Sequence, residues 1–216
     1  MSDLERVEAY FDRVTEGFDA IYSGKKPSFF RLWDRITRQS LHERLEFCLA
    51  TLSPLSGRSV LDVGCGSGRG SVALAERGAR VVGIDVSSRM LEMARALALA
   101  RSVNERCTFE HIDVIGMDRR LVFDHAVATG FWDYVLDPLP VMQTLGVVVQ
   151  DSLVASFPAR SAFRVPFRAL WLRARGCPIR FYSAREITEL CDRSGFDLKE
   201  LRHSGPMFLL HAQRRR

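Results

Sequence analysis

The chain has 216 residues, a net charge of +5, 47% hydrophobic residues and 26% charged residues. This length and balance predict one globular domain with a small appended cap. No apolar run is long enough to span a bilayer, and the acidic, mixed start argues against a secretory signal peptide. The five cysteines are scattered without a CxxC pair, so neither a disulfide framework nor a metal site is expected, and the predicted compartment is the cytoplasm.

The chain begins with a helical region and continues as strands that alternate with helices. Residues 1–55 are predicted to form an N-terminal helical lid, with helices over 3–22 and 28–52 and a turn at SGKKP between them. The predicted strands are 60–63, 80–84, 107–110, 121–129, 152–157, 196–203 and 207–213. Predicted helices are 68–77, ended by Gly78, a helix capped by Ser87, 138–149 and 184–194.

This alternation predicts an α/β fold with a mostly parallel sheet and helices on both faces. The last two strands are joined by a tight GP turn, so they are expected to pair antiparallel. Ligands of such sheets bind beyond the carboxyl ends of the strands. The residues that follow each strand are therefore the candidates for a binding site.

A glycine loop follows the first predicted strand in VLDVGCGSGRG, residues 60–70. Glycines let a chain turn tightly and let a ligand approach the backbone, and the next helix directs its N–H groups at that ligand. The dinucleotide pattern GxGxxG requires a glycine where this chain has Arg69, and no GK[ST] follows, so neither pyrophosphate pattern fits. NAD-dependent oxidoreduction is disfavoured for the same reason.

Acidic residues accompany this loop at the strand ends. Asp62 would repel a phosphate, but it could hold the loop's N–H groups or bind a cationic ligand. Asp85 ends the second strand, where an acid accepts ribose hydroxyls, although it could cap the next helix instead. Ile112 offers an apolar face for a purine, and Asp113 a carboxylate for its exocyclic amine. Together they describe a nucleoside with a cationic amino-acid tail.

The segments VLDVGCGSGRG, GARVVGIDVSSRMLEMAR and FEHIDVIGMD resemble the class I methyltransferases that use S-adenosylmethionine (SAM), over about residues 58–137. The resemblance implies a Rossmann-like, seven-stranded sheet whose last strand is antiparallel, a core over 56–216, and a substrate-cap insertion at about 158–182. It implies SAM as cofactor and S-adenosylhomocysteine as product. The implied cofactor-binding residues are Asp62, Gly64, Cys65, Gly66, Ser67, Gly68, Asp85, Val86, Met90, Ile112, Asp113, Val114, Thr129 and Gly130.

The stretch after the fourth predicted strand lies beside the transferred methyl in that family. It lacks the [ND]PP[YF] signature of enzymes that methylate planar amines, so nucleic acid is not an expected partner. A general base is needed only when the acceptor holds a proton of high pKa. The candidates are Asp133 and Tyr134, just past the strand end, and Tyr22, beside the SGKKP turn, whereas Trp132 is a candidate acceptor contact.

The predicted insertion carries arginines interleaved with aromatic residues. Arg164 and Arg168 are spaced as on one helix face, so they are candidate contacts for an anionic planar acceptor, although a solvated helix face explains them equally well. Peripheral membrane contact through such a segment is an alternative, and the expected assembly is a monomer or homodimer.

The layout outside the cofactor core also resembles, less closely, the magnesium-protoporphyrin O-methyltransferases, which act on a propionate. The shared features include the YF…FD.IY pattern near the start and the LVASFP strand. That family has a histidine in the stretch aligning near residues 132–134, where this chain has Tyr134. The wider expectation is methyl transfer to oxygen, nitrogen or carbon of a small molecule. A non-catalytic SAM-binding regulator is the alternative of another class.

Overall fold

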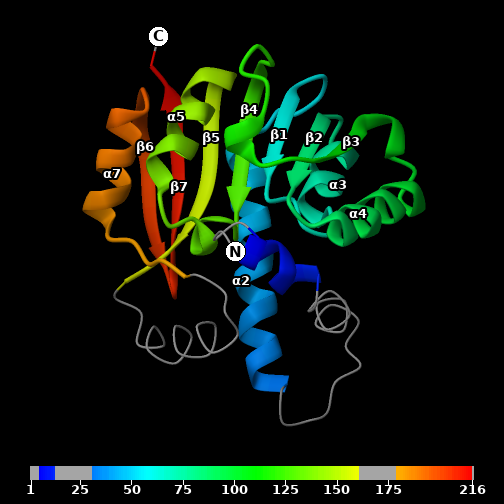
Figure 1. Cartoon of the computed structure of the whole chain (residues 1–216), viewed down its shortest axis with the longest axis horizontal. Helices are drawn as coiled ribbons and strands as arrows, with labels where there is room; N and C mark the ends of the chain where they lie inside the picture. The colour runs from blue at the N-terminus through cyan, green and yellow to red at the C-terminus, as the bar shows by residue number, and fades with distance from the viewer. Residues whose placement is uncertain (1–4, 13–30, 161–178, 216) are drawn as a thin grey trace.

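The computed structural model describes residues 5–12, 31–160 and 179–215, which form a single seven-stranded sheet flanked by helices (Figure 1). The strands are β1 Ser59–Val63, β2 Arg80–Asp85, β3 Cys107–His111, β4 Phe123–Thr129, β5 Val149–Pro158, β6 Phe196–Ser204 and β7 Met207–Arg214. The helices are residues 5–12, α2 Arg31–Thr51, α3 Arg69–Glu76, α4 Ser88–Ala100, α5 Pro138–Val148 and α7 Ala184–Arg193, with short 3-10 turns η2 Asn104–Arg106, η3 Val114–Gly116 and η4 Trp132–Tyr134.

The sheet has the order β3-β2-β1-β4-β5-β7-β6. Neighbouring strands from β3 to β5 pair in parallel, whereas β7 runs antiparallel to both β5 and β6. The predicted Rossmann-like α/β fold with an antiparallel last strand is therefore confirmed. The strand order reverses at β1 and β4, so the chain connections leave in opposite directions there, which is where such sheets open a crevice for a ligand.

Each face of the sheet carries its own hydrophobic core. One core packs under α5 and α7 and includes Leu61 and Val63 of β1, whereas the other packs under α2, α3 and α4 and includes Val60. Because side chains alternate along a strand, Asp62 must point to the same face as Val60. Figure 1 shows α2 passing behind the sheet and α5 in front of it.

The ends of several described helices carry local capping signals, and their bounds lie within three residues of the predicted ones. The Ser87 hydroxyl accepts a hydrogen bond from the Met90 N–H and so caps α4. Gly78, two residues after α3, adopts a φ of 91°. Ser183 and Glu186 form a reciprocal capping box at the start of α7. These local signals fix the helix boundaries independently of the packing.

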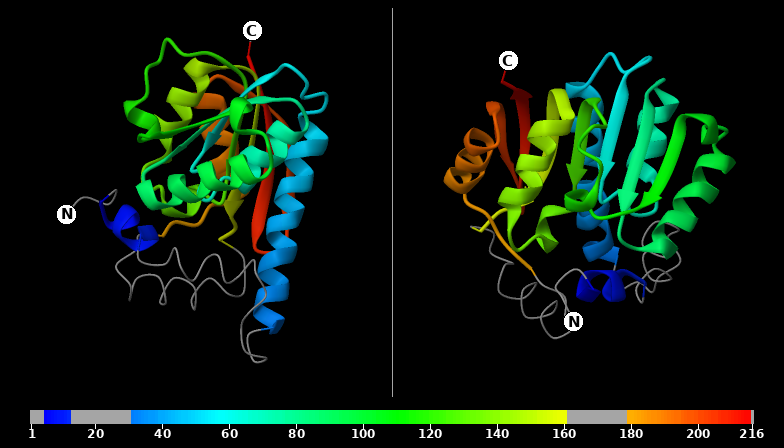
Figure 2. Two further views of the ribbon diagram at one scale, coloured as in Figure 1. Left: turned by 90° about the vertical axis from the view of Figure 1, so that its right-hand side faces the viewer. Right: turned by 45° about the horizontal axis from the view of Figure 1, so that its top comes forward.

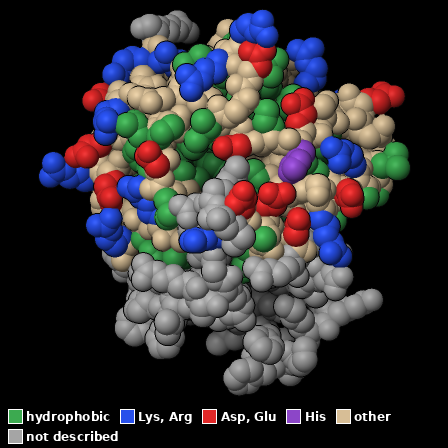
Figure 3. All heavy atoms as spheres, in the orientation of Figure 1, with side chains coloured by type: hydrophobic (Ala, Val, Ile, Leu, Met, Phe, Trp, Pro, Cys, Tyr) green, Lys and Arg blue, Asp and Glu red, His purple; other side chains and the backbone are tan. Residues whose placement is uncertain are grey.

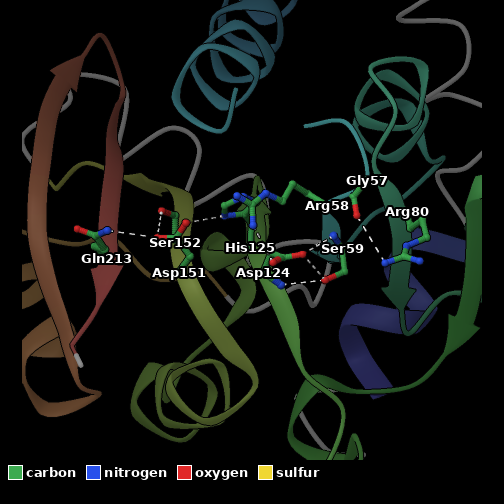
Figure 4. Close-up of polar contacts among 9 residues, drawn as sticks. All are labelled: Gly57, Arg58, Ser59, Arg80, Asp124, His125, Asp151, Ser152 and Gln213. Carbon is green, nitrogen blue, oxygen red and sulfur yellow. Dashed lines mark hydrogen bonds and ion pairs between the residues drawn. The ribbon is translucent and has the colours of Figure 1, made fainter. Parts of the chain in front are cut away.

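The two ends of the sheet differ in what covers them. Figure 2 shows the helix of residues 5–12 lying across the carboxyl ends of the central strands. Figure 4 shows the opposite end, where polar side chains of β1, β4 and β5 form hydrogen bonds and ion pairs with their neighbours. There Asp124 accepts hydrogen bonds from the Ser59 N–H at 2.7 Å and its hydroxyl at 2.8 Å, and pairs with Arg58 at 3.1 Å. These bonds tie the amino ends of β1 and β4 together, whereas the predicted ligand contacts lie at the carboxyl ends of the strands.

Within the described ranges, no helix combines the length and the apolar composition that crossing a bilayer requires.

The contact between α5 and the end of α7 leaves no room for a side chain at Gly146. A methyl group there would meet the Ser194 carbonyl oxygen, which is backbone and cannot rotate away. We therefore expect Gly146→Ala to lower the free energy of unfolding by about 1–3 kcal/mol, the usual cost of overpacking. Urea unfolding measures this change.

Gly116→Ala is the matched control, because a methyl group at Gly116 has no atom within 4 Å. We expect that variant to unfold close to the wild-type midpoint. Equal stability of the two variants would contradict the close approach of α5 to the carboxyl end of α7.

Candidate active site at the carboxyl end of the sheet

The loop between β1 and α3 follows a path that requires glycine. Gly66 and Gly68 have φ values of 52° and 76°, in the left-handed region. A side chain at Gly68 would also strike Ala94 of α4, at 2.7 Å, so this glycine lets α3 and α4 approach each other. At Gly66 an added methyl group would have no atom within 4 Å, so the loop presents bare backbone to open space.

Asp85, the last residue of β2, holds this loop. Its Oδ2 accepts a hydrogen bond from the Gly66 N–H at 2.9 Å, and its Oδ1 accepts one from the Ser87 N–H at 2.9 Å. Burial raises the pKa of Asp85, although these N–H donors favour its charged form. A carboxylate has about four lone-pair positions, so two amide partners leave capacity for ligand hydroxyls. The helix cap itself is supplied by the hydroxyl of Ser87.

Asp62 lies behind the loop and does not line the cavity. It is 5% exposed, and its Oδ2 accepts a hydrogen bond from the Ser71 hydroxyl of α3 at 2.6 Å. Burial is the main reason why the pKa of Asp62 rises to about 6, and the charge of Asp85 raises it further. In the described structure Asp62 therefore braces the start of α3 and does not line the cavity.

A cavity of about 1090 Å³ opens between the glycine loop, the strand ends and the helices of residues 5–12 and α2. Most of the predicted site residues line it. They are Gly64, Cys65, Gly66, Ser67, Asp85, Val86, Met90, Ile112, Asp113, Val114, Thr129, Gly130, Asp133 and Tyr134. Gly68 lies below the surface of the cavity, as Asp62 does. Among the described residues, no cluster of three or more His, Cys, Asp or Glu side chains has the geometry of a metal site.

The turn η4, after β4, brings Asp133 and Tyr134 to the cavity wall. Asp133 is 3% exposed, and the Tyr134 ring contacts the Phe11 ring edge-on, with centroids 5.0 Å apart. Tyr182, which precedes α7, fixes the turn because its hydroxyl donates a hydrogen bond to the Trp132 carbonyl oxygen at 3.2 Å. The candidate acid and phenol are thus held in place by a residue outside the turn.

The prediction that Trp132 contacts an acceptor needs correction. Its side chain is fully buried and stacks on Phe157, with ring centroids 4.6 Å apart, so it belongs to the core beneath the cavity. The remaining predicted residues, Tyr22, Arg164 and Arg168, lie outside the residues that the structure describes.

Several residues that the sequence did not single out also line the cavity. They are Val7 of the first helix, Arg44 and Leu45 of α2, Phe131, and Leu136. Only the fold brings α2 and the 131–136 stretch to the same cavity, so no local pattern could have found these residues, except that Phe131 adjoins Gly130.

In Figure 3 acidic side chains gather across the middle of the face that Figure 1 shows.

Residues 60–148 match the family described as a methyltransferase domain. Among curated proteins, the ubiquinone biosynthesis O-methyltransferase of Leptothrix cholodnii is 34% identical over 109 residues, which are 50% of this chain and 46% of that protein. The matched region thus spans less than half the length of that relative.

Solved structures match over nearly the whole chain. The magnesium protoporphyrin IX methyltransferase of Synechocystis PCC 6803, solved with bound S-adenosylhomocysteine, superposes with a TM-score of 0.79 at 20% identity, and the match covers 99% of this chain and 100% of that one. The [4+2]-cyclase SpnF superposes with a TM-score of 0.71 at 17% identity, over 97% and 95% of the two chains. At these identities the likeness shows the fold alone.

The raised pKa of Asp62 predicts a pH dependence of stability. An acid whose pKa is higher in the folded than in the unfolded state, about 3.9, stabilises the fold when protonated, and this contribution is lost as the pH rises through the folded pKa. Wild-type stability should therefore fall between about pH 4 and the folded pKa of about 6 on account of Asp62. We expect Asp62→Asn to gain stability relative to wild type over that interval, measured by urea unfolding.

Asp118→Asn is the control of opposite sign, since the hydrogen bonds from Arg120 lower the pKa of that exposed carboxyl. That variant should gain no stability relative to wild type as the pH rises. A constant free-energy difference between Asp62→Asn and wild type across the same pH range would contradict the buried position of the carboxyl group.

Proposed function

Since residues 60–148 match a methyltransferase domain, we propose that the protein is a class I methyltransferase that transfers a methyl group from SAM to a small-molecule acceptor. The observation that carries this proposal is the juxtaposition of bare backbone at Gly66 with the carboxylate of Asp85 in one cavity. The loop sequence matches neither of the two phosphate-binding motifs, and an acid lies next to it. This combination suits a nucleoside that carries no phosphate.

The cavity residues fit SAM along its length. The Asp85 carboxylate is available for ribose hydroxyls, Ile112 for one face of adenine, and Asp113 for the exocyclic amine. Gly64 and Gly130, on the loops after β1 and β4, line the part of the cavity where the methionine end would lie. When bound, SAM supplies a methyl group on a sulfonium, which is already an activated leaving group.

The chain's own contribution to such a transfer is alignment and exclusion of water. Phe11, from the helix across the strand ends, packs on Tyr134 and closes one side of the cavity. Asp133 and Tyr134 are the proposed proton acceptors for an acceptor group of high pKa, because both line the cavity after β4. Tyr22 stays a candidate from the sequence.

The proposed acceptor is a small molecule, and its class is open among oxygen, nitrogen and carbon nucleophiles. Two specific acceptor classes have support. A propionate of a tetrapyrrole is the alternative that the sequence resemblance to the magnesium-protoporphyrin O-methyltransferases implies, and the Synechocystis enzyme of that name shares the fold. An oxygen acceptor is favoured by the sequence match to a ubiquinone biosynthesis O-methyltransferase, and a catechol serves as its probe below.

The domain layout proposed from the sequence is retained, with a refinement. Residues 1–55 were expected to act as a lid, but Phe47, Cys48 and Leu52 of α2 are buried against the sheet. We propose that the closing role belongs to the helix of residues 5–12.

The four cysteines in the described ranges are free thiols, and the cytoplasm remains the proposed compartment.

A methyl-transfer assay tests this function. The protein is incubated with SAM labelled in its methyl group and with acceptors of three classes: a metallated porphyrin with free propionates, a catechol, and an aliphatic amine. Label in any product, together with formation of S-adenosylhomocysteine, supports the proposal and names the class. SAM binding without label transfer to these acceptors or to a metabolite extract would favour the non-catalytic regulator.

Asp85 gives the sharpest prediction for cofactor binding. Asp85→Asn keeps the side-chain shape, but it removes the negative charge from the position proposed for the ribose. It also replaces one carboxylate oxygen, which accepts a backbone N–H, with an amide NH₂ group that cannot accept it. Hydrogen bonds to charged groups contribute about 1.5–3 kcal/mol, so we expect the dissociation constant for SAM to rise about ten- to a hundredfold. Isothermal titration calorimetry measures it.

Asp118→Asn removes the same charge from an exposed site and should bind SAM as the wild type does. Unchanged affinity in Asp85→Asn, with both proteins folded, would remove Asp85 from the binding site.

A further inference from the structure

The stretch between β4 and α5 lines the cavity but has little regular structure of its own. Residues 133–137 all line the cavity, and we call them the acceptor wall. The turn η4 is three residues long, and α5 begins only at Pro138, after a residue whose side chain makes no cap bond. Because a short 3-10 turn closes few hydrogen bonds, the carbonyl groups of this stretch need partners from elsewhere in the chain.

Two of these carbonyl groups are bound by the hydroxyl of Tyr182. The hydroxyl oxygen lies 3.2 Å from the Trp132 carbonyl oxygen and 3.0 Å from the Val135 carbonyl oxygen, so both share its single proton. The Tyr182 side chain is fully buried, and burial raises the pKa of Tyr182, so the hydroxyl keeps its proton and remains a donor. The ring contacts Phe157 edge-on, with centroids 5.0 Å apart, which fixes the direction of the hydroxyl.

Two further carbonyl groups of the same stretch are bound by Arg180. Its backbone N–H donates to the Asp133 carbonyl oxygen at 2.8 Å, and its guanidinium group donates to the Leu136 carbonyl oxygen. The guanidinium group also lies over the Tyr182 ring, 5.0 Å from the ring centroid. We call residues 180–182 the support segment, because two of its three residues bind four carbonyl groups in or next to the acceptor wall.

The support segment is itself fixed to the end of β5. The Tyr182 N–H donates to the Pro158 carbonyl oxygen at 2.8 Å, and the Arg160 N–H donates to the Tyr182 carbonyl oxygen at 2.9 Å. These contacts connect β5 to the acceptor wall, whereas the loop after β1 is held by Asp85. The two sides of the cavity are therefore fixed by separate sets of hydrogen bonds.

We infer that Tyr182 and Arg180 are positioning residues for methyl transfer, which set the place of the acceptor wall without affecting the binding of the methyl donor. The inference rests on the proposed function, since Asp133 and Tyr134 of the wall are proton acceptors only within it. Neither Tyr182 nor Arg180 lines the cavity, so both act through the backbone of the wall. Alignment is what such a transfer requires, and a displacement of about 1 Å can lower its rate about a hundredfold.

Tyr182→Phe tests the inference, because it keeps the buried ring and removes only the hydroxyl. With the acceptor that the wild type methylates, we expect kcat to fall about ten- to a hundredfold. The dissociation constant for SAM, measured by calorimetry, should be unchanged. Hydrogen exchange, measured by mass spectrometry, should become faster in residues 132–136 and stay at the wild-type rate in the glycine loop, residues 64–68.

Thr144→Val is the matched control. The Thr144 hydroxyl is also buried, and it also donates to a carbonyl oxygen, that of Pro140 within α5, at 3.0 Å. This variant should keep the wild-type kcat and the wild-type exchange rate in residues 132–136. Arg180→Met removes the bond to the Leu136 carbonyl oxygen and should lower kcat at unchanged SAM affinity, so it decides the question if Tyr182→Phe does not fold.

A wild-type kcat in Tyr182→Phe, or an unchanged exchange rate in residues 132–136, would overturn the inference. A loss of SAM affinity as large as the loss of kcat would also overturn it, because the role of Tyr182 would then be a general structural one. A wild-type protein that transfers no methyl group would instead overturn the proposed function. The exchange rates would then still decide whether the support segment sets the place of the acceptor wall.

Discussion

The site depends on one carboxylate that joins two βα units. Asp85 ends β2, yet it accepts hydrogen bonds from Gly66 in the loop after β1 and from Ser87 at the start of α4. Through these bonds the left-handed path of the loop and the start of the next helix are set by the same group. The glycines permit that path, and Asp85 selects it from the many that glycines allow. Bare backbone and a hydroxyl acceptor therefore come together in one place.

This arrangement concentrates negative charge beneath the cavity. Asp62 and Asp85 are both held in positions where burial raises their pKa, and the charge of Asp85 raises the pKa of Asp62 further. A ligand with a positive centre relieves that cost when it binds, whereas a phosphate adds to it. The electrostatics of the cavity thus favour a ligand with a positive centre over a pyrophosphate.

The sequence was sufficient for features that depend on local chemistry. The strands, the Ser87 cap and the closing antiparallel pair follow from periodicity and turn residues, and most loop residues at strand ends do line the cavity. The direction of Asp62 could also have been predicted from its alternation with Val60. Trp132 could not, because a short turn has no period that separates a core side chain from a cavity one. Arg44 required the packing of α2, which no pattern within that helix specifies.

Specificity for the acceptor is a separate problem from binding the cofactor, because one fold hosts unrelated reactions. Here the turn η4, which carries Asp133 and Tyr134, is tied to the stretch before α7. The Arg180 N–H donates to the Asp133 carbonyl oxygen at 2.8 Å, and Arg180 and Arg160 both contact Glu186 of α7, at 3.8 and 2.9 Å. Residues 160 and 180 lie near the two ends of the predicted substrate-cap insertion, 158–182. The contacts of Arg160 and Arg180 therefore act on the side of the cavity that η4 forms, whereas the bonds of Asp85 hold the loop after β1.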